Sequence, residues 1–423
     1  MAAKSYPKIL EGKIQLGHYP QEKLKQVDKP TTLITDHVQR FDERETGFNR
    51  ASRGDLGPIG KKGVTIGREI ISKAIFSMFF SFPPVDVGGP GAPGIPPMPN
   101  GRTSIPPLSQ MPDTMRKRLK DMIGKDVSEM SPQDILAAIS APAGGTSGKT
   151  NYPDDPAIIS RHIKSLGYFL RADIMGVCEL PQYAVYSHDN AGNVVECGHK
   201  YAISVVVDQG YRTFKACRGD DWISFSQSMR SYTGSAFISY QIANYIRNLG
   251  YSARVNHAEN YQVVVPPILL LSGIGEMCRA GIVLNPFLGI RFKAAVITTN
   301  LPLLPDKPVD FGLQDFCNKC KKCAQECPSH AISDGSRIMH NGYETWEFNA
   351  ERCTKYRLGN PNGAMCGRCI KVCPWNKPEG WNHDAVRWMV KNTPFMNNLI
   401  IKMNDLLGYH KPYKEYQWWF DPI

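Results

Sequence analysis

Apolar and polar positions in the second half of the chain follow strand-like and helix-like patterns in turn. Tyr201–Asp208 (YAISVVVD) is a short run of β-branched residues that predicts a buried strand. Tyr251–Val255 and Arg291–Thr298 predict two more strands. Ser231–Leu249 predicts a helix that Gly250 ends, because glycine readily adopts the left-handed conformation found just after a helix. The apolar stripe of this helix consists of Ile238, Ile242, Tyr245, Ile246 and Leu249.

Helices are also expected on either side of this region. Asp155–Tyr168 predicts a helix with Asp154 or Asp155 near its N-cap. After Cys373 we expect a helical tail rich in aromatic residues, which ends in Trp418-Trp419-Phe420. The alternation of helices and strands before the cysteines indicates an α/β region.

The first 150 residues carry a weaker pattern. Helices are predicted near Ile66–Phe80, over Asp113–Ile123 and after Ser131. Between them, Phe82–Pro112 is so rich in proline and glycine that it excludes a regular helix or a central strand. Two interpretations stay open for this segment: a disordered linker, which is the commoner outcome, or an ordered wrap that lines or covers a cavity.

Composition and charge narrow the class of protein. The chain has 423 residues, of which 42% are hydrophobic and 21% charged, as expected of a folded protein. Its net charge of +11 is spread without a basic run of five or six, which favours a basic surface for acidic electron donors or anionic substrates over nucleic-acid binding.

The longest apolar stretches, Ile70–Phe82 and Val263–Ile274, fall short of the ~20 residues that cross a bilayer. The N-terminus shows neither twin arginines nor a signal-peptide pattern, so we expect a cytoplasmic protein.

Eight of the twelve cysteines fall into two runs that predict iron–sulfur ligation. Each run contains the spacing C-x2-C-x3-C-P, and the first adds a further C-x2 before it. Zinc sites rarely repeat this pattern, and disulfides belong to small secreted chains. In each run the last cysteine is expected to ligate the other cluster. Cluster one then takes Cys317, Cys320, Cys323 and Cys373; cluster two takes Cys327, Cys353, Cys366 and Cys369. The other four, predicted to be core or structural thiols, are Cys178, Cys197, Cys217 and Cys278.

Longer stretches around these runs resemble a known family. The order SGIGEMCRAGIVLNPFLGIRFKAAVITTNLPLLPDKPVDFG, FCNKCKKCAQECPSHAIS, CTKY, CGRCIKVCPWNK and WNHDAVRWMV is similar to the cobalamin-dependent reductive dehalogenases, over about residues 150–410. The resemblance implies an α+β fold: a nitroreductase-like α/β domain that binds a corrinoid, beside a ferredoxin-like module with two [4Fe–4S] clusters. In that family the clusters reduce cobalt, and cobalt removes a halogen from an organic substrate.

The resemblance also implies site residues. Tyr232 matches the family's catalytic proton donor and Lys293 its basic partner, with Arg291 the alternative partner or a substrate contact if the alignment slips by two. Lysine at this position is similar to the catabolic branch that acts on halogenated phenols and hydroxybenzoates. Arg357 lies in the twelve residues between Cys353 and Cys366, which a plain two-cluster ferredoxin lacks. It resembles that branch's binder of the substrate anion. Taken singly, Tyr232, Lys293 and Arg357 are better explained as a packed aromatic side chain, an edge-strand charge and a surface ion pair. Taken together with the cysteine runs, they favour function for Tyr232 and Lys293.

The corrinoid leaves little trace in the sequence. No DxHxxG element is present, because Asp36-His37 is followed by VQR, which is consistent with the family's base-off binding. The expected contacts are Gly250, Tyr251, His257, Ser272, Gly273 and Gly275. His257 is equally explained as a core histidine.

The chain is accordingly divided into an N-terminal region (1–150), the corrinoid-binding domain (151–310), the ferredoxin-like module (311–380) and the helical tail (381–423). The family's twin-arginine leader and its fused flavin and [2Fe–2S] reductase module are missing, so we expect an external ferredoxin, flavodoxin or reductase as donor. Two alternatives remain: an epoxyqueuosine reductase acting on tRNA, and an electron-transfer protein without a substrate.

Overall fold

A computed structural model describes residues 15–58 and 154–413 apart from 220, 259 and 361–364. Several predictions lie outside the described residues. These are the helices near Ile66–Phe80, over Asp113–Ile123 and after Ser131, the segment Phe82–Pro112, and Trp418-Trp419-Phe420.

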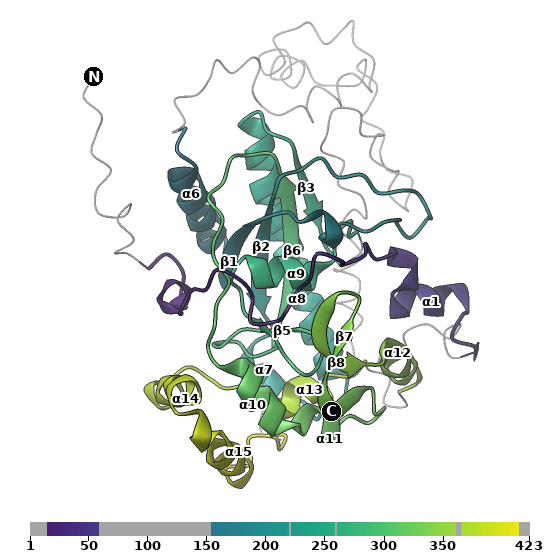
Figure 1. The fold of residues 1–423 in the computed structure, drawn as a ribbon, viewed down its shortest axis with the longest axis vertical. Coiled ribbons are helices and arrows are strands. Elements are labelled where there is room, and N and C mark those ends of the chain that lie inside the picture. The colour runs from purple at the N-terminus through teal and green to yellow at the C-terminus, as the bar shows by residue number, and fades with distance from the viewer. Residues whose placement is uncertain (1–14, 59–153, 220, 259, 361–364, 414–423) are drawn as a thin grey trace, which may run out of the picture.

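A four-stranded antiparallel sheet forms the centre of the molecule (Figure 1). Its strand order is β1 (Ile174–Glu179), β2 (Tyr201–Asp208), β6 (Phe292–Thr299) and β3 (Ala253–Asn256). The strand predicted over Tyr201–Asp208 is confirmed with the same bounds, and the other two predicted strands are confirmed within two residues. β2 and β6 pair along their whole length, with Tyr201 opposite Thr299 and Asp208 opposite Phe292.

Two helices cover one face of this sheet. α6 (Pro156–Phe169) begins as predicted, because the Asp155 carboxylate accepts a hydrogen bond from the Ala157 amide. α8 (Trp222–Asn248) packs Ile238, Ile242 and Ile246 against the sheet. It ends as predicted, with Gly250 at φ +90°.

The predicted start of α8 was wrong. The helix begins nine residues before Ser231, so Tyr232 lies in its interior and not at its head. The segment Ser224–Ser231 misled the pattern because Ser224, Ser226 and Ser231 are buried polar side chains at positions where a helix normally presents apolar ones.

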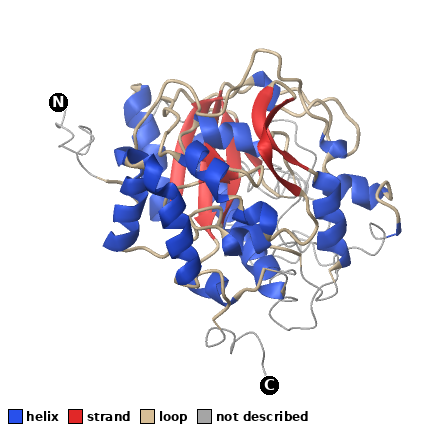
Figure 2. Cartoon of the chain, turned by 60° about the horizontal axis from the view of Figure 1, so that its bottom comes forward, coloured by secondary structure: helices blue, strands red, loops and turns tan. Residues whose placement is uncertain are grey.

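The opposite face of the sheet is covered by α9 (Val265–Leu271) and the short strands β4 (Glu276–Met277) and β5 (Val283–Leu284). Figure 2 shows the strands in the interior with helices around them. Two short helices also lie between α6 and the cysteine-rich region: η6 (Gln182–Ala184) and α7 (Tyr211–Ala216).

The cysteine-rich region packs onto α7 and the start of α8 through one shared core. Phe214 and Ile223 from those helices lie in the same cluster as Phe316, Ile370 and Trp375. The region contains α10 (Leu313–Cys320), α11 (Lys322–Gln325), the hairpin β7 (Ile332–His340) and β8 (Tyr343–Phe348), α12 (Ala350–Gly359) and α13 (Arg368–Val372). The predicted helical tail follows as α14 (Trp381–Asn392), η7 (Pro394–Met396) and α15 (Asn397–Leu406).

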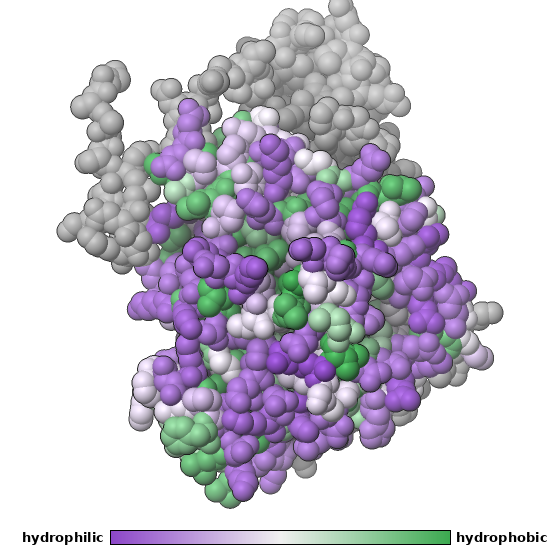
Figure 3. All heavy atoms as spheres, viewed as in Figure 1, coloured by the Kyte–Doolittle hydropathy of each residue, from purple (hydrophilic) through white to green (hydrophobic). Residues whose placement is uncertain are grey.

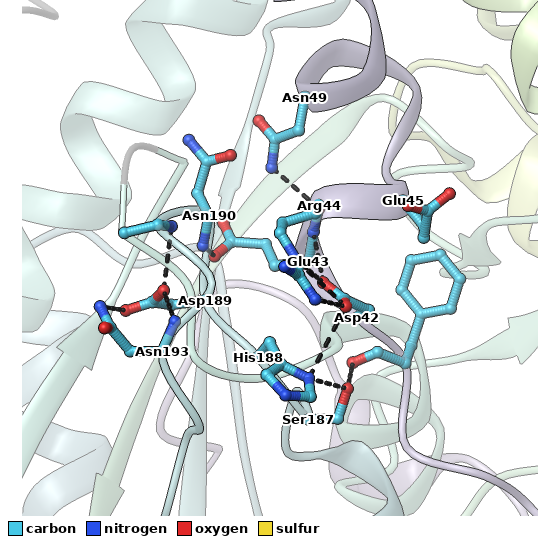
Figure 4. Close-up of polar contacts among 12 residues, drawn as sticks. Asp42, Glu43, Arg44, Glu45, Asn49, Ser187, His188, Asp189, Asn190 and Asn193 are labelled. Atoms are coloured by element: carbon cyan, nitrogen blue, oxygen red, sulfur yellow. Dashed lines mark hydrogen bonds and ion pairs between the residues drawn. The ribbon is translucent and has the colours of Figure 1, made fainter. Parts of the chain in front are cut away.

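The described N-terminal residues form η2 (Gln21–Lys23), η3 (Glu43–Glu45) and α1 (Gly47–Arg53), and they run across the domain surface. Figure 4 shows how η3 is fixed to the loop that contains His188 and Asn190. The Asn190 amide donates to Glu43 Oε2 at 2.9 Å, and His188 Nδ1 lies 3.6 Å from Asp42 Oδ2. α1 lies beside α12, which brings Phe48 of α1 close to Arg357 of α12.

Among the described residues, no helix is both long enough and apolar enough to span a bilayer.

Candidate functional site

The structure brings Tyr232 and Lys293 together. On β6, Phe292 and Ala294 point into the core on the α9 side, so Lys293 between them points towards α8. Its Nζ lies over the ring of Tyr232, 5.2 Å from the centroid. An ammonium group over a phenol is held by the ring's π electrons, and it favours the phenolate if the hydroxyl loses its proton.

Tyr232 packs in a small aromatic and methionine cluster. Phe225 and Met229 from α8 form it together with Met365, and Phe48 of α1 packs against them. Sequence patterns missed these side chains, because Phe48 and Met365 come from segments far from α8 in the chain. Their contact follows from the placement of α1 and α12.

Arg357 reaches the same cluster from α12. Its guanidinium lies over the ring of Phe48 at 4.4 Å from the centroid, and its Nη2 lies 3.0 Å from Met365 Sδ. Its Nε is buried and has no hydrogen-bond partner within the described part of the chain. A guanidinium in this state has a donor left for an anionic ligand.

Arg291 lies elsewhere and is buried. Its Nε donates to Asp208 Oδ1 at 2.8 Å and its Nη1 to Asn376 Oδ1 at 2.5 Å, while its guanidinium faces the ring of Tyr211. These contacts join β2 to the segment after Cys373. They therefore favour a structural role for Arg291 over the predicted contact with a substrate or with Tyr232.

The first predicted cysteine quartet lines one small cavity between α10 and Trp375. Arg279 holds the loop beside it: its Nε donates to the Cys317 carbonyl at 3.1 Å and its Nη1 to those of Ser333 and Gly335. Six cysteines line this cavity: the predicted quartet Cys317, Cys320, Cys323 and Cys373, together with Cys278 and Cys369. A mostly apolar space lined by the whole predicted quartet fits a cubane cluster.

The second quartet is also brought together. The Cys369 thiol interacts electrostatically with those of Cys366, Cys353 and Cys327. Burial raises the pKa of Cys366 to about 11, and the Arg357 charge opposes this rise. Arg357 thus lies between these cysteines and the cluster around Tyr232.

A single metal ion has no comparable site. No group of three His, Cys, Asp or Glu side chains in the described ranges is arranged to hold one ion. A cubane differs, since each thiolate binds its own iron and the sulfurs stand farther apart.

The four other cysteines are mostly packed as predicted. Cys178 and Cys217 are buried, and Cys197 packs against the core that contains Cys178. Cys278 is the exception, because it lines the cavity of the first quartet. Nothing in its spacing signals this position.

The expected corrinoid contacts do not form one surface. Tyr251 packs on the α6 and α8 side of the sheet, whereas Ser272 follows α9 on the other side, with its Oγ 2.9 Å from that of Ser204. A Cβ on Gly273 would lie 2.5 Å from the Lys307 carbonyl, and one on Gly275 would lie 2.0 Å from that of Leu284. Gly273 and Gly275 permit close backbone packing here, and the corrinoid contacts of Ser272, Gly273 and Gly275 stay a prediction.

The remaining expected contacts are differently placed. His257 is buried, and its Nε2 lies 3.2 Å from the Tyr240 hydroxyl of α8. Gly250 is exposed at the end of α8, with open space where a Cβ would be. His257 thus fits the interpretation as a core histidine, and Gly250 that of a helix terminator.

Several buried polar atoms lie on or beside α8. Gln209 Oε1, Thr233 Oγ1 and Ser239 Oγ are buried without a partner within the part of the chain that the structure describes, as is Arg357 Nε. Each such atom costs about 1–3 kcal/mol unless a ligand or water bonds to it. Thr233 and Ser239 lie about 120° apart around α8, so these atoms do not by themselves define one surface for a corrinoid.

Comparison with known proteins agrees with this arrangement. A family model described as a 4Fe–4S dicluster domain matches residues 316–377. The tetrachloroethene reductive dehalogenase of Sulfurospirillum multivorans is 37% identical over 185 residues, which are 42% of this chain and 36% of that protein. The trichloroethene reductive dehalogenase of Dehalococcoides mccartyi is 27% identical over 312 residues, 62% of this chain and 53% of that protein.

A solved structure is similar over most of the chain. The catabolic reductive dehalogenase NpRdhA, solved in complex with 3-bromo-4-hydroxybenzoic acid, has a TM-score of 0.77 and 36% identity, covering 96% of this chain and 52% of that one. This chain thus spans about half the length of that structure and about a third to a half of the two relatives.

The fold and site define an iron–sulfur protein of mixed helix and sheet with a 4Fe–4S dicluster domain. Within that class, the chain resembles the cobalamin-dependent reductive dehalogenases over most of its length.

Proposed function

We propose that this protein is a reductive dehalogenase, an oxidoreductase that replaces a carbon–halogen bond by a carbon–hydrogen bond. The observation that carries the proposal is the Lys293 ammonium over the Tyr232 ring, 5.2 Å from its centroid. The pair lies on the α8 side of the sheet, in reach of the cluster that Arg357 also contacts. The similarity to reductive dehalogenases also supports removal of a halogen as the reaction.

The proposed substrate is a halogenated phenol or hydroxybenzoate. Arg357 supports this class, because its guanidinium is held by Phe48 and Met365 and retains a buried donor for a carboxylate or phenolate. The similar NpRdhA was solved with 3-bromo-4-hydroxybenzoic acid, which belongs to this class. Phe48, Phe225 and Met229 supply apolar surface for its ring.

Two [4Fe–4S] clusters are proposed to relay the electrons, with the ligand sets given by the two quartets. The mutual interactions of Cys327, Cys353, Cys366 and Cys369 support the exchange of the fourth ligand between the two runs. The second cluster would lie nearer the substrate, since its cysteines feel the charge of Arg357. A base-off corrinoid in a nitroreductase-like domain is proposed as the acceptor of these electrons.

The reaction takes two electrons and one proton and releases a halide ion. Bound corrinoid would supply the reduced cobalt that removes the halogen. Tyr232 is proposed to give its hydroxyl proton to the carbon, and the Lys293 ammonium stabilises the phenolate that remains. Arg357 orients the substrate by its anionic group, and solvent then returns a proton to Tyr232.

The two alternative functions find less support. A pure electron-transfer protein needs the dicluster domain but not the Tyr232–Lys293 pair or the donor on Arg357. An epoxyqueuosine reductase would need a surface for a tRNA stem, whereas Arg357 in its apolar cluster suits a small aromatic anion.

The test is a cobalt and iron determination on protein purified anaerobically from cells supplied with cobalamin, followed by a screen of brominated and chlorinated phenols. We expect about one cobalt and eight irons per chain, and halide release that depends on a reductant. Iron without cobalt would refute the proposal, and reduction of an epoxyqueuosine-containing tRNA stem would favour the tRNA alternative.

A further inference from the structure

The C-terminal helices expose an unusual amount of apolar surface. Trp381, Phe395 and Leu406 are 84%, 80% and 89% exposed. Figure 3 shows hydrophobic colouring over α14 and α15, at the lower left of the view. We refer to these residues as the C-terminal apolar face: Trp381, Trp388, Phe395, Leu399, Met403, Leu406 and Leu407. Contiguous apolar surface of this kind marks an interaction site more often than chance exposure.

The inner side of α15 packs on α10, the helix that carries Cys317 and Cys320. Ile401 lies in the same buried cluster as Cys317, with Ile400 packed against it. Lys377 donates to Asn404 Oδ1 at 2.6 Å, and its charge acts on the Cys373 thiol. The C-terminal apolar face is therefore separated from the first cluster by one helix, whereas the second cluster lies towards Arg357 and Tyr232.

Charge near this face is positive. Between Leu313 and Lys411 the chain has fourteen Lys and Arg but nine Asp and Glu. The two acidic side chains on the helices are paired: Asp405 with Lys322, and Asp384 with Arg387. Lys402 and Lys411 are exposed beside them. Such a surface favours an acidic partner over a second copy of this basic chain.

We propose that the C-terminal apolar face is the docking site of a small acidic electron-carrier protein that reduces the first cluster. The inference rests on the proposed function in that it names the partner from which the electrons come. Each encounter transfers one electron: the reduced carrier is oxidised and one [4Fe–4S] cluster is reduced. Two encounters supply the two electrons of one turnover, entering at the first cluster and leaving from the second.

The experiment measures cluster reduction alone, with no organohalide present. Protein with both clusters assembled is mixed anaerobically with a reduced plant-type [2Fe–2S] ferredoxin, or with reduced methyl viologen, and the bleaching of the cluster absorbance is followed. The variants Phe395→Ser and Leu406→Ser alter the face. The matched control is Phe169→Ser, since Phe169 at the end of α6 is 82% exposed and lies far from the cysteines.

We expect the second-order rate with ferredoxin to fall on the order of ten-fold in Phe395→Ser and Leu406→Ser, with the viologen rate and the control unchanged. Lys402→Gln should also lower the ferredoxin rate, and more so at low salt. Equal ferredoxin rates in all variants would overturn the proposal. So would a face that instead holds a dimer together or binds anionic vesicles while the ferredoxin rate stays unchanged. Because this experiment uses no organohalide, its result can be interpreted even if the dehalogenase assay fails.

Discussion

Lys293 occupies an unusual position for a lysine, on a strand whose neighbours are apolar. β6 lies between β2 and β3, but β3 pairs only with Val296–Thr299, so on that side the described strands leave β6 open at Lys293. The ammonium lies on the α8 side of this strand, over the ring of Tyr232. Burying part of an ammonium has a cost that a surface lysine avoids, which favours a chemical role over that of an edge charge.

Replacing Tyr232 by Phe tests the proton donor. The ring and its contacts with Met229 and Met365 remain, so both clusters and the corrinoid should be retained. Turnover should fall by about 10²–10⁴-fold, because general-acid catalysis is lost. The measurement is steady-state halide release with iron and cobalt contents determined in parallel. Tyr245→Phe on the same helix is the control, and a near-normal rate in Tyr232→Phe would remove this hydroxyl from the mechanism.

Replacing Lys293 by Met tests its partner. Methionine keeps the length and loses the charge, so kcat should fall by about 10²-fold while the clusters stay assembled. Lys293→Arg should recover part of the rate, since it restores a cation over the ring. If both residues act on one proton transfer, the double variant Tyr232→Phe, Lys293→Met should be scarcely slower than Tyr232→Phe alone. Additive losses would show that the two act independently.

At the scale of elements, regular periodicity was predictable and packing was not. The strand Tyr201–Asp208 and the end of α8 followed from local pattern, since burial on both faces and a C-terminal glycine leave clear signals. The start of α8 did not, because buried serines break the apolar period. The dicluster domain was predictable from ligand spacing, whereas the contact of Phe48 with Arg357 depends on tertiary placement of α1 against α12.

The loop after α9 shows the same limit, because glycine there permits two explanations that spacing does not separate. Gly275 is predicted to contact a cofactor, and it also lies close to the Leu284 carbonyl. Gly275→Ala should therefore destabilise the fold by about 3 kcal/mol or more, since a Cβ would collide with backbone. Thermal unfolding before corrinoid is added measures this. Gly198→Ala, where a Cβ meets nothing within 4 Å, should change stability by less than about 0.5 kcal/mol. An unchanged melting temperature in Gly275→Ala, with weaker corrinoid binding, would favour the cofactor role.

At the scale of the whole molecule, the dicluster domain and the sheet domain are joined through α7 and the start of α8. Phe214 and Ile223 lie in the core that contains the cysteines, while the strands pack with α6 and α8 in a separate core. The first quartet lies by the C-terminal helices and the second by Arg357, so the proposed electron path runs from the C-terminal apolar face to the proposed substrate site. This division predicts that loss of the clusters destabilises the dicluster domain more than the sheet domain.

Removal of iron tests that division. Without the clusters, the cavity beside Cys317 and Cys373 is left empty. The short helices α10, α11 and α13 then lose the clusters that their cysteines are proposed to bind. Helices of four to eight residues are not stable by themselves, so they should lose amide protection from exchange. β2 and β6, paired over their full length in a core without these cysteines, should keep it. The melting temperature of the whole chain should fall by about 10 °C, because metal binding contributes to folding. Hydrogen exchange with and without iron, read by mass spectrometry, makes the comparison. Equal loss of protection in β6 and α13 would show that the clusters stabilise the entire chain. The dicluster domain and the site at Tyr232 would then unfold as one cooperative unit.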